Sequence, residues 1–164
     1  MILKGYSSMN LLDVLSYNPM TGAFTWKVNV GRAYVGDVAG TVNNRAGALV
    51  IGFKGKRILA HRLAWFVHYG IWPKGDIDHI NGNAKDNRID NLRDVSHAVN
   101  TQNIRKAHKD NRSGLLGVSK AGKRYLAQLN HKGERVLCKL FDSPEEAHSA
   151  YVSKKRELHE GCTI

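Results

Sequence analysis

The sequence predicts an α+β protein built from small antiparallel sheets and short helices, and two observations carry this prediction. Several short runs alternate apolar with polar residues and are separated by turn residues, as the strands of hairpins are. Two longer segments, residues 60–69 and 144–158, carry apolar side chains at helical spacing. With 164 residues the chain is long enough for two or three small modules in series.

The first 58 residues predict a short helix followed by β-structure that packs on the middle of the chain. A short apolar stripe stops at Asn18-Pro19, which ends the helix. Lys54-Gly55 is a turn signal between two apolar runs. The expected elements are a helix over residues 10–17, a strand over residues 24–28, and a hairpin made by residues 48–51 and 58–59.

Residues 59–104 predict a helix, a hairpin and a second helix. Gly70 and Pro73 follow the first helical stripe and end it. Asn81-Gly82 is a strong turn dipeptide, and Ser96 offers an N-cap. The expected elements are a helix over residues 60–69, strands over residues 76–80 and 92–95 around a polar loop of residues 83–90, and a helix over residues 97–107.

Residues 105–113 are basic and lack an apolar period, so we place a linker there that contacts phosphate. Residues 114–164 then predict a separate module in which one helix covers one face of a three-stranded antiparallel sheet. Ser143-Pro144 and Glu146 supply the N-cap, the first-turn proline and the acidic residue that start this helix. The expected strands are residues 115–119, 125–130 and 135–141. The uncovered sheet face is left for a ligand.

The composition points to a polyanionic partner. Lys and Arg number 25 against 14 Asp and Glu, which gives a formal charge of +11. The alternative is that the basic surface only keeps the protein soluble. The two cysteines, Cys138 and Cys162, form no Cys-x-x-Cys pair, which argues against a disulfide framework or a zinc knuckle. No apolar run suggests a signal peptide or a membrane span, so we expect an intracellular, cytoplasmic protein without an obligate protein partner.

Asp78, His79 and Asn100 are the residues that suit metal-assisted cleavage of a phosphodiester. Such a cleavage needs a hard cation at the phosphate and a base that takes a proton from water. Asp78 and Asn100 offer the oxygen ligands that Mg²⁺ prefers, and DNA phosphate and water would complete the shell. His79 is a suitable base because its ordinary pKa, near 6.5, leaves the imidazole mostly neutral at physiological pH.

Three further polar residues are expected near these groups. Asn91 either holds the loop or accepts a hydrogen bond from the second ring nitrogen of His79. His61, on the first turn of its helix, either approaches the site or caps and packs. Asn103 shares nearly one helix face with Asn100.

The string from Asp78 to Asn100 resembles the HNH motif of phage and intron-encoded homing endonucleases. Asn91 follows His79 after twelve residues and Asn100 follows nine later, and the upstream Ala60-His61-Arg62-Leu63-Ala64-Trp65 resembles the lead-in of the same group. The resemblance implies a ββα-metal finger that hydrolyses DNA with one divalent ion, in a phage-encoded protein acting inside a bacterial host. It makes Asp78 and Asn100 metal ligands, His79 the general base and Asn91 the central Asn. Because Asn100 replaces the final His, magnesium or manganese is expected rather than zinc.

The C-terminal module resembles the plant ethylene-response-factor DNA-binding domain, which also occurs fused to phage HNH nucleases. The resemblance lies in Gly117-Val118-Ser119, residues 124–129 and residues 140–147. It implies that the sheet lies in the major groove. By side-chain chemistry, Arg135 suits guanine, Gln128 or Asn130 suits adenine, and the lysines suit phosphate, while the alternative is a solvated sheet face with scattered charge. The expected DNA-binding residues are Ser119, Lys120, Lys123, Arg124, Gln128, Asn130, Arg135 and Lys139, with Leu137 also facing the groove.

Together these features predict a metal-dependent DNA endonuclease of site-preferring, homing or nicking type. The alternative is a non-catalytic DNA-binding regulator that keeps the finger as a scaffold. An RNA-binding or structural protein is a third possibility, which the lack of an exposed aromatic ladder on the sheet disfavours.

Overall fold

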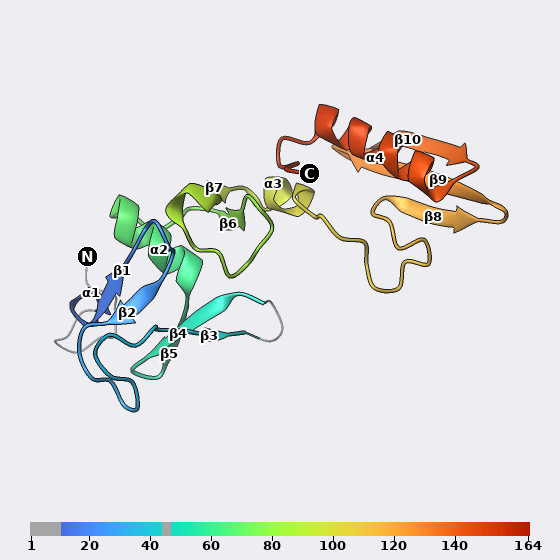
Figure 1. Cartoon of the computed structure of the whole chain (residues 1–164). Coiled ribbons are helices and arrows are strands. Elements are labelled where there is room, and N and C mark those ends of the chain that lie inside the picture. The colour runs from blue at the N-terminus through green and yellow to red at the C-terminus, as the bar shows by residue number, and fades with distance from the viewer. Residues whose placement is uncertain (1–10, 44–46) are drawn as a thin grey trace. The chain divides into compact units, whose positions relative to one another are not determined.

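The computed structural model describes residues 11–43 and 47–164 and divides into two compact units, with the boundary along the chain between Ser96 and His97 (Figure 1). Short helices and small antiparallel sheets make up both units, and a three-stranded sheet followed by a helix ends the chain. The predicted α+β class is therefore confirmed. Among the described residues, no helix combines the length and the apolar character that crossing a membrane requires.

The first unit begins with a single helical turn and two small antiparallel sheets. The strand order is β1-β2 in one sheet and β3-β4-β5 in the other. The hairpin expected around Lys54-Gly55 is confirmed, with positive φ at both turn residues. The elements are α1 (Leu11–Val14), β1 (Leu15–Tyr17), β2 (Phe24–Trp26), β3 (Thr41–Val42), β4 (Leu49–Phe53) and β5 (Lys56–Leu59).

The helix expected over residues 10–17 is wrong beyond Val14. Residue 10 lies outside the described residues, and residues 15–17 form β1, which pairs with β2 in the register Leu15↔Trp26. Leu15 is buried in β1, and its apolar character alone does not distinguish a strand from a helix. Pairing with a strand later in the chain decides the outcome, and helical spacing over a few residues cannot report it.

The second half of the first unit follows the predicted pattern closely. α2 (Ala60–Tyr69) ends at Gly70, which adopts the left-handed conformation with φ 74° and donates its N–H to Phe66. β6 (Asp76–His79) and β7 (Leu92–Val95) pair antiparallel, with the 3₁₀ helix η1 (Ile89–Asn91) just before β7. The predicted helix and hairpin are confirmed. The local stop signals, Gly and the Asn-Gly turn, explain why.

One apolar core joins these elements. Ile51, Leu63 and Ala64 are fully buried, and Ile77 and Leu92 bring the β6–β7 hairpin into the same cluster. The hairpin is therefore held by packing against α2 and the N-terminal sheets rather than by its own pairing alone, which is marginal for two strands.

The second unit contains α3 (His97–Gln102), β8 (Val118–Ala121), β9 (Arg124–His131), β10 (Glu134–Phe141) and α4 (Pro144–Leu158). Its antiparallel sheet has the order β10-β9-β8, and α4 packs on one face of it (Figure 1). α4 starts as predicted, because the Glu146 N–H donates to the Ser143 hydroxyl at 3.2 Å. The three-stranded module with its helix is confirmed.

α3 is shorter than the expected helix over residues 97–107. The chain after Gln102 is held by the C-terminal end instead: the Lys155 ammonium donates to the Ile104 carbonyl at 2.6 Å, and the Gly161 N–H donates to the Gln102 side chain at 3.0 Å. Lys155 is only 2% exposed and its ammonium lies 5.8 Å from the centre of the Tyr151 ring. The predicted apolar stripe of α4 did not include this lysine.

Gly117 is a point where the C-terminal module tolerates no side chain. Its φ is 75°, and a Cβ there would lie 2.1 Å from the Tyr151 ring of α4. We expect Gly117→Ala to destabilise the second unit by about 1–3 kcal/mol more than Gly122→Ala, because both require a positive φ but only Gly117 overpacks the core. At Gly122, with φ 63°, a Cβ meets nothing within 4 Å.

Amide hydrogen exchange of β9 measures this difference, because its protection reports the opening free energy of that sheet. Equal exchange in Gly117→Ala and Gly122→Ala would contradict the packing explanation.

Candidate functional site

The β6–β7 hairpin places two polar residues at the end of a buried strand. Asp78 pairs in register with Arg93 and His79 with Leu92. Asp78 and His79 are only 5% and 8% exposed, although they are the most polar residues of β6 beside Asp76. Burial of such groups is costly unless each has a polar partner, so the partners define the site.

Arg93 is the partner of Asp78. Its Nε and Nη2 atoms lie 2.8 and 2.6 Å from Asp78 Oδ2, which makes a charge-assisted pair across the hairpin. The arginine was not predicted as a site residue. Its register position directly opposite Asp78 is the signal that could have identified it, because facing residues of an antiparallel pair touch.

Asn87 is the partner of His79. Its Oδ1 lies 3.2 Å from His79 Nε2, and Asn87 is 1% exposed. An acceptor at Nε2 places the ring proton there, which leaves Nδ1 with a lone pair. Burial lowers the pKa of His79, against opposing effects of the Asn87 bond and of the Asp78 and Asp86 charges. The imidazole is therefore neutral at physiological pH and suited to act as a base.

His61 reaches this site from the first turn of α2. Its ring meets the His79 ring edge-on, with centroids 5.1 Å apart and planes at 89°. Burial, together with the smaller effects of the neighbouring His79 and Arg62, lowers the pKa of His61 to about 4. The structure thus places the His61 ring in contact with His79, and whether His61 takes part in a reaction or only packs stays a prediction.

Asn91 holds the loop before β7. Its Oδ1 accepts the Asn81 N–H at 2.9 Å and its Nδ2 donates to the Asp86 carbonyl at 2.8 Å. Asp86 pairs with Arg88 at 2.6 Å, and the hydrogen bonds and charge of that arginine lower the pKa of Asp86 to about 2. Asn91 thus takes the first of its two predicted roles, and Asn87 takes the second.

Asn100 and Asn103 lie in the second unit, on α3 and just after it. The Thr163 hydroxyl donates to the Asn103 side chain. Metal binding by Asn100 together with Asp78 remains a prediction, since the two residues belong to different units. Within residues 11–43 and 47–164, no group of three or more His, Cys, Asp or Glu side chains is placed to hold a metal ion. A carboxylate and an amide oxygen are the hard donors that suit Mg²⁺ or Mn²⁺.

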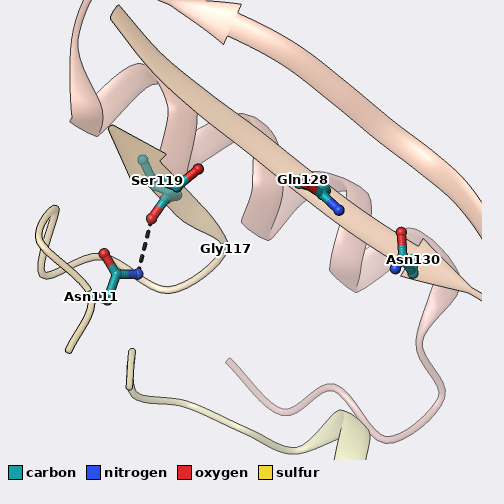
Figure 2. Close-up of a pocket in the computed structure, with 6 residues that line it drawn as sticks. Asn111, Gly117, Ser119, Gln128 and Asn130 are labelled. Atoms are coloured by element: carbon teal, nitrogen blue, oxygen red, sulfur yellow. Dashed lines mark hydrogen bonds between the residues drawn. The ribbon is translucent and has the colours of Figure 1, made fainter. Parts of the chain in front are cut away.

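The uncovered face of the C-terminal sheet carries several of the residues predicted to bind DNA. Ser119, Gln128 and Asn130 line a hollow of about 260 Å³ with Asn111, whose Nδ2 donates to the Val118 carbonyl at 2.9 Å (Figure 2). Arg135 pairs in register with Asn130 and is exposed. The arrangement is a polar face with amide donors and acceptors, of the kind that can contact base edges.

The remaining predicted residues of this module lie elsewhere. Lys120 and Lys139 point to the same face of the sheet as Val118 and Ala127, which is the face that α4 covers. Both lysines are nevertheless exposed. Lys123 lies in the turn before β9.

Arg124 pairs with Asp142 at 2.8 Å. The groove-facing position expected for Leu137 is wrong: it pairs with Leu129 on the core side, because a bulge between Arg135 and Leu137 shifts the register and leaves Cys138 opposite Gln128.

Residues 59–102 match the family model described as HNH endonuclease. The matched segment includes α2, the β6–β7 hairpin and α3, and with them His61, Asp78, His79, Asn91 and Asn100. No curated protein and no solved structure gives a match to the chain. The chain thus carries an HNH endonuclease domain in residues 59–102, which indicates a nuclease that acts on DNA.

Proposed function

We propose that this protein is a metal-dependent DNA endonuclease in which His79 is the general base. The observation that carries the proposal is the pairing of His79 Nε2 with Asn87 Oδ1 at 3.2 Å, beside the buried Asp78 carboxylate. A base held by a second group in one tautomer, next to a potential metal ligand, is the arrangement that hydrolysis of a phosphodiester needs.

In the proposed reaction, Nδ1 of His79 accepts a proton from a water molecule as that water attacks phosphorus. Asn87 keeps the other ring proton in place and so keeps Nδ1 in its unprotonated, basic form. Arg93, held against Asp78, adds positive charge beside the place where the phosphate would bind. The neutral His61 ring fills the space at the edge of His79 and excludes water from it.

Asp78 and Asn100 would hold one Mg²⁺ or Mn²⁺ ion, with DNA phosphate and water completing its shell. The ion would supply charge stabilisation at the phosphate and the leaving oxygen. With two protein oxygens as ligands, we expect weak metal binding to the free protein and tighter binding in the presence of DNA.

The C-terminal sheet face would place the protein on DNA. Ser119, Gln128, Asn130 and Arg135 supply the polar groups of that face, and the +11 charge of the chain supports contact with phosphate. A separate positioning module beside a cutting domain favours a site-preferring enzyme of homing or nicking type. A phage-encoded protein acting in the bacterial cytoplasm, as the sequence resemblance implies, is part of this proposal.

End-labelled duplex DNA incubated with the protein tests the function directly. We expect shortened products with Mg²⁺ or Mn²⁺, none in the presence of EDTA, and bands at a limited set of positions if cleavage is site-preferring. Products that appear equally in EDTA would contradict metal dependence, and a uniform ladder would contradict site preference.

The pH profile of cleavage tests the role of the buried base. Because desolvation lowers the pKa of His79, we expect the acid limb of the rate to have its midpoint below pH 6.5, the ordinary value of a histidine. His61, with a pKa of about 4, stays neutral over this range, while Asp86, with a pKa of about 2, stays charged. Single-turnover rates between pH 5 and pH 8 measure this. An acid limb centred above pH 7 would contradict a buried neutral base.

The second candidate is a non-catalytic DNA-binding regulator, favoured by the polar sheet face of the second unit. It predicts that the protein shifts the mobility of DNA yet never changes its length or topology over a range of Mg²⁺ and Mn²⁺ concentrations. The partners of Asp78 and His79 favour the nuclease, because a scaffold has no need for an oriented, buried histidine.

A further inference from the structure

The turn between β1 and β2 packs directly on the loop that carries Asn87. Gly22, with φ 73°, approaches so closely that a Cβ there would lie 2.4 Å from the Arg88 nitrogen and 2.5 Å from the Asn87 carbonyl carbon. The Tyr17 hydroxyl donates to the Asn87 carbonyl at 2.7 Å, and the Ile89 N–H donates to the Pro19 carbonyl at 3.2 Å. Residues 17–22 therefore contact the backbone of Asn87 and of both residues that follow it.

Hydrogen bonds within the turn itself hold residues 18–23 in place. Asn18 exchanges backbone bonds with Gly22 and Ala23 at 2.8 and 2.9 Å, and its side chain accepts from the Met20 and Thr21 N–H groups at 3.0 and 3.3 Å. A turn so closed offers a fixed surface to the neighbouring loop.

The position of the Asn87 side chain depends on this backbone support. Its Oδ1 is bound to His79, but its Nδ2 is buried and has no hydrogen-bond partner among the described residues. The side chain is thus not anchored by a second bond of its own. A small shift of the Asn87 backbone would carry Oδ1 away from His79 Nε2 and release the ring proton to either nitrogen.

We propose that Tyr17 and Gly22 are positioning residues for the nuclease reaction, acting on His79 through Asn87. The inference rests on the proposed function, since Tyr17 and Gly22 of the β1–β2 hairpin can affect cleavage in this way only if His79 is the base. Gly22 permits the close approach, Tyr17 fixes the Asn87 carbonyl, and Asn87 then holds the proton on Nε2 of His79. The N-terminal sheet is in this way a part of the catalytic unit and not only its packing partner.

Tyr17→Phe is the conservative test, because the ring contact with Phe24 at 4.8 Å remains while the hydroxyl is lost. We expect the single-turnover cleavage rate to fall about fivefold, the size of one hydrogen bond, with the DNA dissociation constant unchanged. Tyr34→Phe, at a tyrosine that is 68% exposed, is the matched control and should leave both quantities at wild-type values. For Gly22→Ala we expect a loss of about tenfold or more. Gly36→Ala is its control, since Gly36 also has a positive φ of 89° but meets nothing within 4 Å.

Two further readouts separate positioning from general loosening of the fold. Nitrogen-15 shifts of the His79 ring should show the Nε2–H tautomer in the wild type and a mixture of tautomers in Tyr17→Phe. In a double-mutant cycle, Tyr17→Phe should have no further effect on the rate once Asn87 is replaced by alanine, whereas a general structural effect would add.

The outcomes are distinguishable. If Tyr17→Phe matches Tyr34→Phe in rate and in ring shifts while His79→Ala is inactive, the inference is overturned and the proposed function stands. Full additivity with Asn87→Ala overturns it as well. If His79→Ala cleaves at the wild-type rate, the proposed function itself fails. Should Gly22→Ala not fold, Tyr17→Phe and the cycle decide the question.

Discussion

Replacing His79 by alanine should slow DNA cleavage by about 10²–10⁴-fold, the range that general-base catalysis contributes. The expected loss is in the chemical step, because His79 is 8% exposed and is held by Asn87 Oδ1 and the His61 ring next to the proposed metal ligand Asp78. Single-turnover rates at saturating protein measure it, together with DNA affinity, which should be unchanged. His68→Ala, an exposed histidine of the same unit, is the control.

The same variant reports on His61. If the neutral His61 ring could replace the missing base, the rate would fall less in His79→Ala than in the variant with both histidines replaced. We expect the two to be equal, because Asn87 orients only His79. A His79→Ala protein that cleaves within a factor of about two of His68→Ala would contradict the mechanism.

Replacing Asp78 by asparagine should reduce cleavage by at least about 10²-fold at limiting Mg²⁺, since one of two proposed protein ligands loses its charge. Asparagine keeps the volume of the buried side chain but removes the ion pair with Arg93. The Arg93 side chain, which is 26% exposed, then loses that partner. Thermal unfolding of the variant therefore accompanies the assay, so that loss of metal binding is separated from loss of stability.

A titration with Mg²⁺ and Mn²⁺ gives the decisive comparison. We expect Asp78→Asn to need a higher ion concentration for half-maximal rate. Asp90→Asn, at an exposed carboxylate of η1, should behave as the wild type. Identical metal dependence in the two variants would mean that Asp78 is not a ligand.

The sequence predicted the parts of the fold that local signals control. The α2 helix ends at Gly70 and the β6–β7 hairpin follows the Asn81-Gly82 turn, as expected. It failed at residues 15–17, where pairing with β2 replaces the expected helix, and at the end of α3, where Lys155 and Gly161 hold the chain. Both failures come from contacts with distant residues, which a local pattern does not contain.

The candidate site shows the same division. Asp78 and His79 could be identified from their place in a motif, and Arg93 could have been found from the hairpin register. Asn87 could not, because it is one of several asparagines in a polar loop and its backbone is held by Tyr17, seventy residues away. The bulge that turns Leu137 toward the core could not be predicted from the sequence either. One extra residue in a strand moves the following side chains to the opposite face of the sheet without any change in the kinds of residue present.

The most direct test of the central claim is the incubation of supercoiled plasmid with the protein in Mg²⁺, beside His79→Ala at the same concentration. The account predicts that the wild-type protein converts supercoiled DNA to open circles before any linear form appears, because the matched HNH domain offers one proposed cutting centre. His79→Ala should leave the plasmid supercoiled while still binding it. Plasmid that stays supercoiled with the wild-type protein at every Mg²⁺ and Mn²⁺ concentration, or that both proteins nick equally, would contradict it.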